Sequence, residues 1–108
     1  MLCDQGDVVL VNFDPGVGHE PHKYRPALVV SADDFNKRSS LVVVCPITST
    51  DNGYPFHIYI ECEDVKGFAC VEALRAVDLQ ARHGRHVGAV GESEMGRILS
   101  LVGAVFNI

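Results

Sequence analysis

The apolar residues of this 108-residue chain occur in short runs that end at glycine, proline or polar turn residues. Runs of this length suit β-strands and are short for helices, so they constrain the fold more than any other feature. The clearest strand-like runs are 6–15, 26–32, 41–47 and 56–62. Within the first run, Val9, Val11 and Phe13 share one face, which we expect to lie in the core. The segment 67–78 predicts two short strands separated by a kink, and 85–91 predicts one more.

Only the final segment, 91–107, follows a helical period. Its apolar residues fall on one stripe, formed by Met95, Ile98, Leu99, Val102, Val105 and Phe106. Gly91 or Ser93 suits the position that caps such a helix. Many short strands before one terminal helix predict a mainly β fold, in which the helix closes one end or flank of a strongly curved antiparallel sheet or barrel. The length predicts a single domain over residues 1–108.

The charge and the cysteines limit the kinds of protein that this chain can be. Its net charge is −5, so bulk attraction does not bring it to nucleic acid, and any site for a polyanion must be local. The N-terminus lacks the basic and apolar regions of a signal peptide, and no apolar run approaches the ~20 residues of a membrane span. The four cysteines include no C-x-x-C motif. We therefore expect a cytoplasmic protein with reduced thiols that does not contact a membrane.

Metal binding and nucleophilic catalysis find little support. Two H-x-x-H pairs occur, His19 with His22 and His83 with His86. Both pairs lie in predicted loops without a third ligand of matching spacing, so we expect solvated histidines, no metal and no cofactor. The chain has no G-x-S-x-G motif, and Cys45 lies in an apolar run where a thiol is expected to be buried and unreactive.

Phosphate binding is the chemistry that the polar residues favour most. Arg25 ends a loop rich in glycine and basic residues, and a guanidinium can grip a phosphate through two parallel N–H···O bonds. Thr48 and Ser49 follow the run 41–47, and their hydroxyls can donate to a phosphate oxygen. Taken alone, an arginine before a strand is more often a surface charge. If 26–32 and 41–47 pair in antiparallel fashion, we expect Arg25 and Thr48 at opposite ends of the two strands, converging only if the sheet curls or another strand intervenes.

Two longer stretches favour phosphate chemistry over a simple surface charge at Arg25. "GDVVLVNFDPGVGHE…YRPALVVSADDFN" and "VVVCPITSTDNGYPFHI" resemble the MazF/PemK family of toxin endoribonucleases from type II toxin–antitoxin pairs. The similarity runs in order over nearly the whole chain. It implies an SH3-like β-barrel of the MazF/CcdB type, a homodimer, and metal-independent, sequence-specific cutting of single-stranded RNA such as mRNA. In that family the 2′-hydroxyl attacks the adjacent phosphate and leaves a 2′,3′-cyclic phosphate and a 5′-hydroxyl.

The resemblance also implies roles for individual residues. The family's catalytic arginine and threonine correspond to Arg25 and Thr48, and its acidic residue corresponds to Glu20. The chemistry of in-line attack agrees, because Arg25 can stabilise the charge of the phosphorane while Thr48 holds a non-bridging oxygen. His22 is a candidate for acid–base catalysis at neutral pH. The other residues that we expect to contact RNA are Lys23, Tyr24, Ser49 and Tyr54.

Two further polar residues have competing interpretations. Glu72 would disfavour nearby phosphate if it lined the RNA site, or it would pair with Arg75. His57 lies on the polar face of a predicted strand, and we favour a core or surface role for it over catalysis.

The implied partner is a cognate antitoxin with an acidic, partly disordered tail, which would bind a local basic patch and apolar pockets. Two alternative functions are a CcdB-like poison of a protein target such as gyrase, and an inactive SH3-like binding module. The poison would not need Arg25 or Thr48, and the binding module would not cut RNA.

Overall fold

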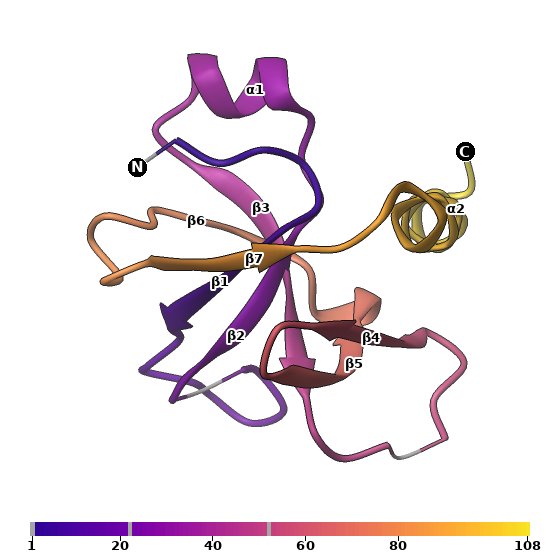
Figure 1. The fold of residues 1–108 in the computed structure, drawn as a ribbon. Coiled ribbons are helices and arrows are strands. Elements are labelled where there is room, and N and C mark those ends of the chain that lie inside the picture. Colours follow the sequence, from indigo (N-terminus) through magenta and orange to yellow (C-terminus); the bar gives the residue numbers. More distant parts are fainter. Residues whose placement is uncertain (1, 22, 52) are drawn as a thin grey trace.

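The computed structural model describes residues 2–21, 23–51 and 53–108, and it shows a curled sheet with a helix beside it (Figure 1). The strands are β1 (Asp7–Asn12), β2 (Tyr24–Val29), β3 (Val42–Thr48), β4 (His57–Cys62), β5 (Val65–Cys70), β6 (Arg75–Val77) and β7 (Arg85–Ala89). The helices are α1 (Asp33–Arg38), the 3-10 turn η1 (Val71–Ala73) and α2 (Glu92–Phe106). The mainly β architecture with one substantial C-terminal helix confirms the fold expected from the sequence.

The strands are antiparallel and follow the order β4-β5-β3-β2-β1-β7, with β6 also paired to β3. Strand β3 is therefore the hub of the sheet. Its C-terminal residues pair with β5, and its N-terminal residues pair with β6. The turn η1 connects these two short strands, so the predicted kink within 67–78 is confirmed.

Alternating side chains build apolar layers on both faces of the sheet. The helix-side core consists of Val8, Leu28, Val30, Cys45, Ile47, Ile60, Cys62, Ala69, Val71, Met95 and Ile98. The second core consists of Cys3, Val9, Val11, Phe13, Ala27, Val29, Val42, Val44, Val77 and Leu79. The predicted core face of β1 belongs to the second core. Because side chains alternate along a strand, neighbouring residues of β1 and β2 are buried in different cores.

Helix α2 begins and packs largely as its periodicity predicts. Gly91 precedes its first turn, and the Gly91 N–H donates to the Glu94 carboxylate at 3.3 Å. Met95 and Ile98 are buried in the helix-side core. The apolar stripe continues past this core, since Val105 and Phe106 are 39% and 57% exposed. A hydrophobic period identifies the packing face of a helix, but it does not say how far the partner surface extends.

Two smaller expectations concern membranes and thiols. Within the described part of the chain, no helix combines the length and apolarity needed to cross a membrane. All four cysteines are free, and Cys45 is buried as predicted.

Candidate functional site

Arg25 and Thr48 lie on neighbouring strands, at the same end of the sheet. In the β2–β3 pairing, Ala27 faces Pro46 and Leu28 faces Cys45. Extending that register by two residues places Arg25 opposite Thr48. The expectation that they lie at opposite ends was wrong, because antiparallel pairing sets the start of one strand beside the end of the next.

Both residues line a cleft of about 1020 Å³. The residues with chemically active side chains on its wall are His19, Glu20, Arg25, Thr48, Tyr54, His57, Cys70, Glu72 and Arg75. They come from the loops before β2 and β4 and from β2, β3, β4, β5, η1 and β6. The cleft therefore draws on segments of the chain that are up to several dozen residues apart.

Thr48 is fixed by backbone pairing on its β5 side and keeps its hydroxyl available. It pairs with Phe68, and a Cβ built on the adjacent Gly67 would lie only 2.5 Å from the Thr48 carbonyl oxygen. This close approach of β5 to β3 requires glycine at position 67. The Thr48 hydroxyl oxygen accepts the Thr50 N–H at 3.3 Å, so the hydroxyl proton can be donated to a ligand.

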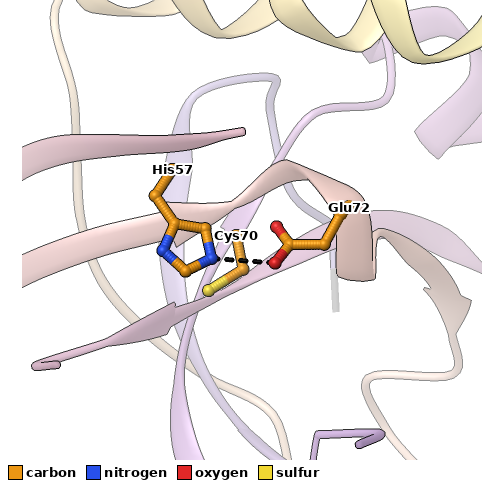
Figure 2. Close-up of side chains that lie close together, drawn as sticks. All are labelled: His57, Cys70 and Glu72. Atoms are coloured by element: carbon orange, nitrogen blue, oxygen red, sulfur yellow. Dashed lines mark hydrogen bonds and ion pairs between the residues drawn. The ribbon is translucent and has the colours of Figure 1, made fainter. Parts of the chain in front are cut away.

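A second group of side chains, His57, Cys70 and Glu72, also lines the cleft and lies close together (Figure 2). The β4–β5 register pairs His57 with Cys70, and the Phe56 carbonyl accepts the N–H of Val71 at 3.0 Å. His57 and Cys70 therefore form the next, non-hydrogen-bonded pair, in which side chains approach most closely. The turn η1 then brings Glu72 back toward them.

The His57 Nε2 atom lies 2.8 Å from the Glu72 Oε2 atom. The His57 side chain is only 4% exposed, whereas that of Glu72 is 39% exposed. Glu72 thus presents its carboxylate to the cleft, and the buried imidazole of His57 contacts one oxygen of that carboxylate. Of the two interpretations of Glu72, the structure favours a place in the cleft over a pair with Arg75. The Arg75 guanidinium lies over the Phe13 ring instead, at 6.0 Å from its centroid.

The thiol of Cys70 is protonated at neutral pH. Burial first, and the Glu72 carboxylate second, raise its pKa to about 11, while the positive charge of Arg25 opposes this rise. The fully buried Cys45 has its pKa raised to about 12, mainly by desolvation, so neither thiol is a ready nucleophile.

Of the other residues expected to contact RNA, Glu20 and Tyr54 line the cleft. The Glu20 carboxylate accepts the Val17 N–H at 3.1 Å, which shapes the loop before β2. The Tyr54 ring lies 5.2 Å from the His57 ring, between centroids. His22 lies outside the described residues.

Within the described ranges, Lys23, Tyr24 and Ser49 lie outside the lining of the cleft. Lys23 has a left-handed backbone (φ 68°), and its N–H donates to the Asp14 carboxylate at 2.7 Å. The Tyr24 hydroxyl donates to the His83 carbonyl at 3.1 Å. The structure therefore gives Lys23 and Tyr24 contacts that organise the loop ends beside β2.

Sequence reasoning did not group His57, Cys70 and Glu72. The signal that links them is the hairpin register, since 57 and 70 face each other across a turn at 63–64. Reading Cys70 as part of a strand and Glu72 as part of the turn after it would have placed all three together. The assembled cleft offers a cation, a hydroxyl donor and a carboxylate around one space, which suits binding and in-line cleavage of a phosphodiester.

Sequence comparison places this chain among toxins. A profile of the family described as PemK-like, MazF-like toxin of type II toxin–antitoxin system matches residues 4–106. The chain is 30% identical over 105 residues to the endoribonuclease toxin MazF of Escherichia coli K12, covering 97% of this chain and 91% of that protein. It is 36% identical over 108 residues to the endoribonuclease toxin ChpB of the same strain, covering 94% and 92%.

Solved structures agree. The fold matches crystalline MazF from Deinococcus radiodurans with a TM-score of 0.91 at 28% identity, covering 100% of this chain and 99% of that chain. MazF in a MazE–MazF crystal from the same organism matches with a TM-score of 0.85 at 27% identity, with the same coverage.

Proposed function

Because the chain belongs to the PemK-like, MazF-like family of toxins from type II toxin–antitoxin systems, we propose that it is an endoribonuclease that cuts single-stranded RNA in the cleft around Arg25 and Thr48. The observation that carries this proposal is the placement of a guanidinium and a hydroxyl donor on adjacent strands, facing one cleft. A scissile phosphate bound between them would meet a fixed positive charge and a fixed donor. Single-stranded RNA can present such a phosphate without first being unpaired.

The proposed reaction is attack of the ribose 2′-oxygen on the adjacent phosphorus. The bond from phosphorus to the 5′-oxygen breaks, which leaves a 2′,3′-cyclic phosphate and a 5′-hydroxyl. Arg25 stabilises the added negative charge of the phosphorane, because a guanidinium keeps its positive charge and binds two oxygens at once. Thr48 donates to a non-bridging oxygen, and such preorganised donors contribute most as the charge develops.

Proton transfers are assigned to groups on the wall of the cleft. The partly exposed carboxylate of Glu72 accepts the proton of the 2′-hydroxyl, while buried His57 holds that carboxylate in position. His19 donates the proton that the leaving 5′-oxygen needs, because its ring also lines the cleft. Tyr54 offers a ring on which a neighbouring base can stack, as single-stranded RNA recognition commonly requires.

The proposed partner is an antitoxin with an acidic, partly disordered tail that folds onto the same cleft. Two of the similar structures are MazE–MazF crystals, and a third is a mycobacterial endoribonuclease in complex with its cognate antitoxin. The local positive charge of Arg25 and Arg75 suits an acidic tail, although the whole chain has a net charge of −5. We further propose that the toxin acts as a homodimer in the cytoplasm.

Incubating the purified protein with a long single-stranded RNA in EDTA, and mapping the ends of the fragments, tests this proposal. We expect defined cuts whose upstream fragments end in cyclic phosphate and whose downstream fragments begin with a 5′-hydroxyl. EDTA should not slow the reaction, because no step requires a metal ion. RNA that stays intact under all conditions would shift the assignment to a protein poison or a binding module.

Glu72→Gln should slow cutting by about 100-fold or more, the usual contribution of a general base. The amide keeps the size of the side chain and its contact with His57, but it cannot accept the 2′-hydroxyl proton. Single-turnover cleavage rates would be compared with those of Glu61→Gln. Glu61 also accepts a side-chain hydrogen bond, from the Tyr59 hydroxyl at 2.9 Å, but it lies outside the cleft lining. Equal rates for the two variants would remove Glu72 from the proposed mechanism.

A further inference from the structure

His57, Cys70 and Glu72 bring three different metal-binding groups into one small volume. One ligand atom from each residue lies within 4.8 Å of the other two. Figure 2 shows the Cys70 sulfur beside the imidazole edge that also faces the Glu72 carboxylate. Neighbouring backbone elements fix all three residues, since the β4–β5 register pairs His57 with Cys70 and η1 follows immediately.

We propose that these three residues bind a zinc ion reversibly, and that zinc bound there inhibits RNA cutting. An imidazole nitrogen, a thiolate and a carboxylate oxygen are the three ligand types that zinc takes in proteins. The thiolate and imidazole disfavour magnesium and calcium, which prefer ligand sets made of oxygen.

The spacing of the ligand atoms suits one tetrahedral ion. Zinc bonds of about 2.0–2.3 Å place neighbouring ligand atoms roughly 3.3–3.8 Å apart. The Nε2–Oε2 distance of 2.8 Å must open slightly, and the sulfur must move inward. Glu72 is on the surface of the cleft and Cys70 is only partly buried, so side-chain rotation can provide these shifts. Three protein ligands leave the fourth position for water or another ligand from the cleft.

Charge and protonation determine how the ion is held. Zinc displaces the proton of the Cys70 thiol to solvent and forms a Zn–S bond, and Glu72 supplies the second negative charge. The nearby guanidinium of Arg25 favours the thiolate but repels the metal. When Nε2 binds zinc, the ring proton resides on His57 Nδ1, a buried atom that has no hydrogen-bond partner among the described residues. This proton costs part of the binding energy, so we expect an exchangeable ion and not a permanent structural one.

Inhibition follows from the position of the site and rests on the proposed function. A zinc ion would occupy the carboxylate that is assigned to accept the 2′-hydroxyl proton. It would also change the charge of the cleft that Arg25 and Thr48 line. Zinc should therefore slow cutting, and a chelator should restore it.

Zinc binding can be measured on the metal-stripped 108-residue chain without any RNA. Zinc competition against a chromophoric chelator should give one ion per chain, and Co²⁺ should produce a thiolate-to-cobalt charge-transfer band. Cys70→Ala should abolish that band. It should also weaken zinc binding by about 100-fold or more, because even indirect partners of metal ligands contribute 10- to 100-fold to affinity. Glu72→Gln should weaken zinc binding as well. This second variant shows whether the loss in Cys70→Ala reflects a missing ligand or a folding defect of that variant. Magnesium should not compete.

His86→Gln is the matched control, because His86 also contacts a carboxylate, that of Asp7 at 3.5 Å, on a different surface. It should bind zinc within a few-fold of the unchanged chain. Equal zinc affinity in Cys70→Ala and His86→Gln, or cobalt binding without the charge-transfer band, would overturn the site. In the RNA assay each protein is compared with its own zinc-free rate. Zinc that binds through Cys70 but leaves cutting unchanged would overturn the inhibitory role, whereas absent cutting without zinc would count only against the proposed nuclease.

Discussion

Arg25→Ala is expected to reduce RNA cutting by roughly 100- to 1,000-fold, the usual cost of removing one preorganised group that stabilises transition-state charge. Arg25 lies opposite Thr48 across the β2–β3 pair and faces the shared cleft. The alanine variant loses both the positive charge and the paired donors, so the phosphorane would be stabilised mainly by Thr48. Single-turnover rates at saturating RNA measure the effect on the chemical step.

Two further variants test whether the effect comes from the bidentate guanidinium group of Arg25. Arg25→Lys keeps the charge but loses bidentate geometry, so it should recover only part of the rate. Arg97→Ala removes an exposed arginine from α2, outside the cleft lining, and should cut like the unchanged chain. Full activity in Arg25→Ala would show that the proposed phosphate site is wrong. Equal losses in both alanine variants would point to a general effect of net charge on RNA affinity.

Ile98→Ala should have the largest effect on folding, because it removes a fully buried side chain from the centre of α2. A change of this kind costs roughly 2–5 kcal/mol of unfolding free energy. Domains of this size have only about 5–15 kcal/mol in total. The melting temperature should therefore fall by about 10 °C or more, as measured by circular dichroism or calorimetry.

A substitution two residues earlier in the same helix is the control. Gly96 is exposed, and a Cβ built on it has nothing within 4 Å. Gly96→Ala should therefore stabilise the chain by up to about 1 kcal/mol through helix propensity alone. If Ile98→Ala melts within a degree or two of the unchanged chain, α2 does not anchor the helix-side core.

The strands and the helix were accessible from the sequence because each depends on a local period. The runs of alternating apolar residues became β1 and β4, and the kink within 67–78 became η1. The relative position of Arg25 and Thr48 was predicted wrongly, because it does not depend on a local period. It depends on the direction in which two strands pair, and antiparallel pairing brings the start of β2 to the end of β3. Given that register, no curl is needed to bring the two residues together.

The grouping of His57, Cys70 and Glu72 was harder to predict, because it depends on several structural features that occur together. His57 meets Cys70 only in one hairpin register, and a slip of one residue would turn the two side chains to different faces. Glu72 joins them only because η1 follows at once. At the end of α2, Phe106 continues the apolar period although it is exposed, so the period alone does not show how far the packing surface extends.

The long separation between paired segments also has a consequence for timing during synthesis. Strand β3 takes partners on both sides, from Ala27 to Val77, and the helix-side core is completed only by Ile98. A ribosome adding about 5–20 residues per second needs roughly 4 to 15 s to proceed from residue 25 to residue 98. Throughout that interval the nascent chain already carries its arginine but has no finished cleft around it. On the proposed function, an active toxin therefore forms only after nearly the whole chain has been made, which would give the proposed antitoxin a short window in which to be present before it.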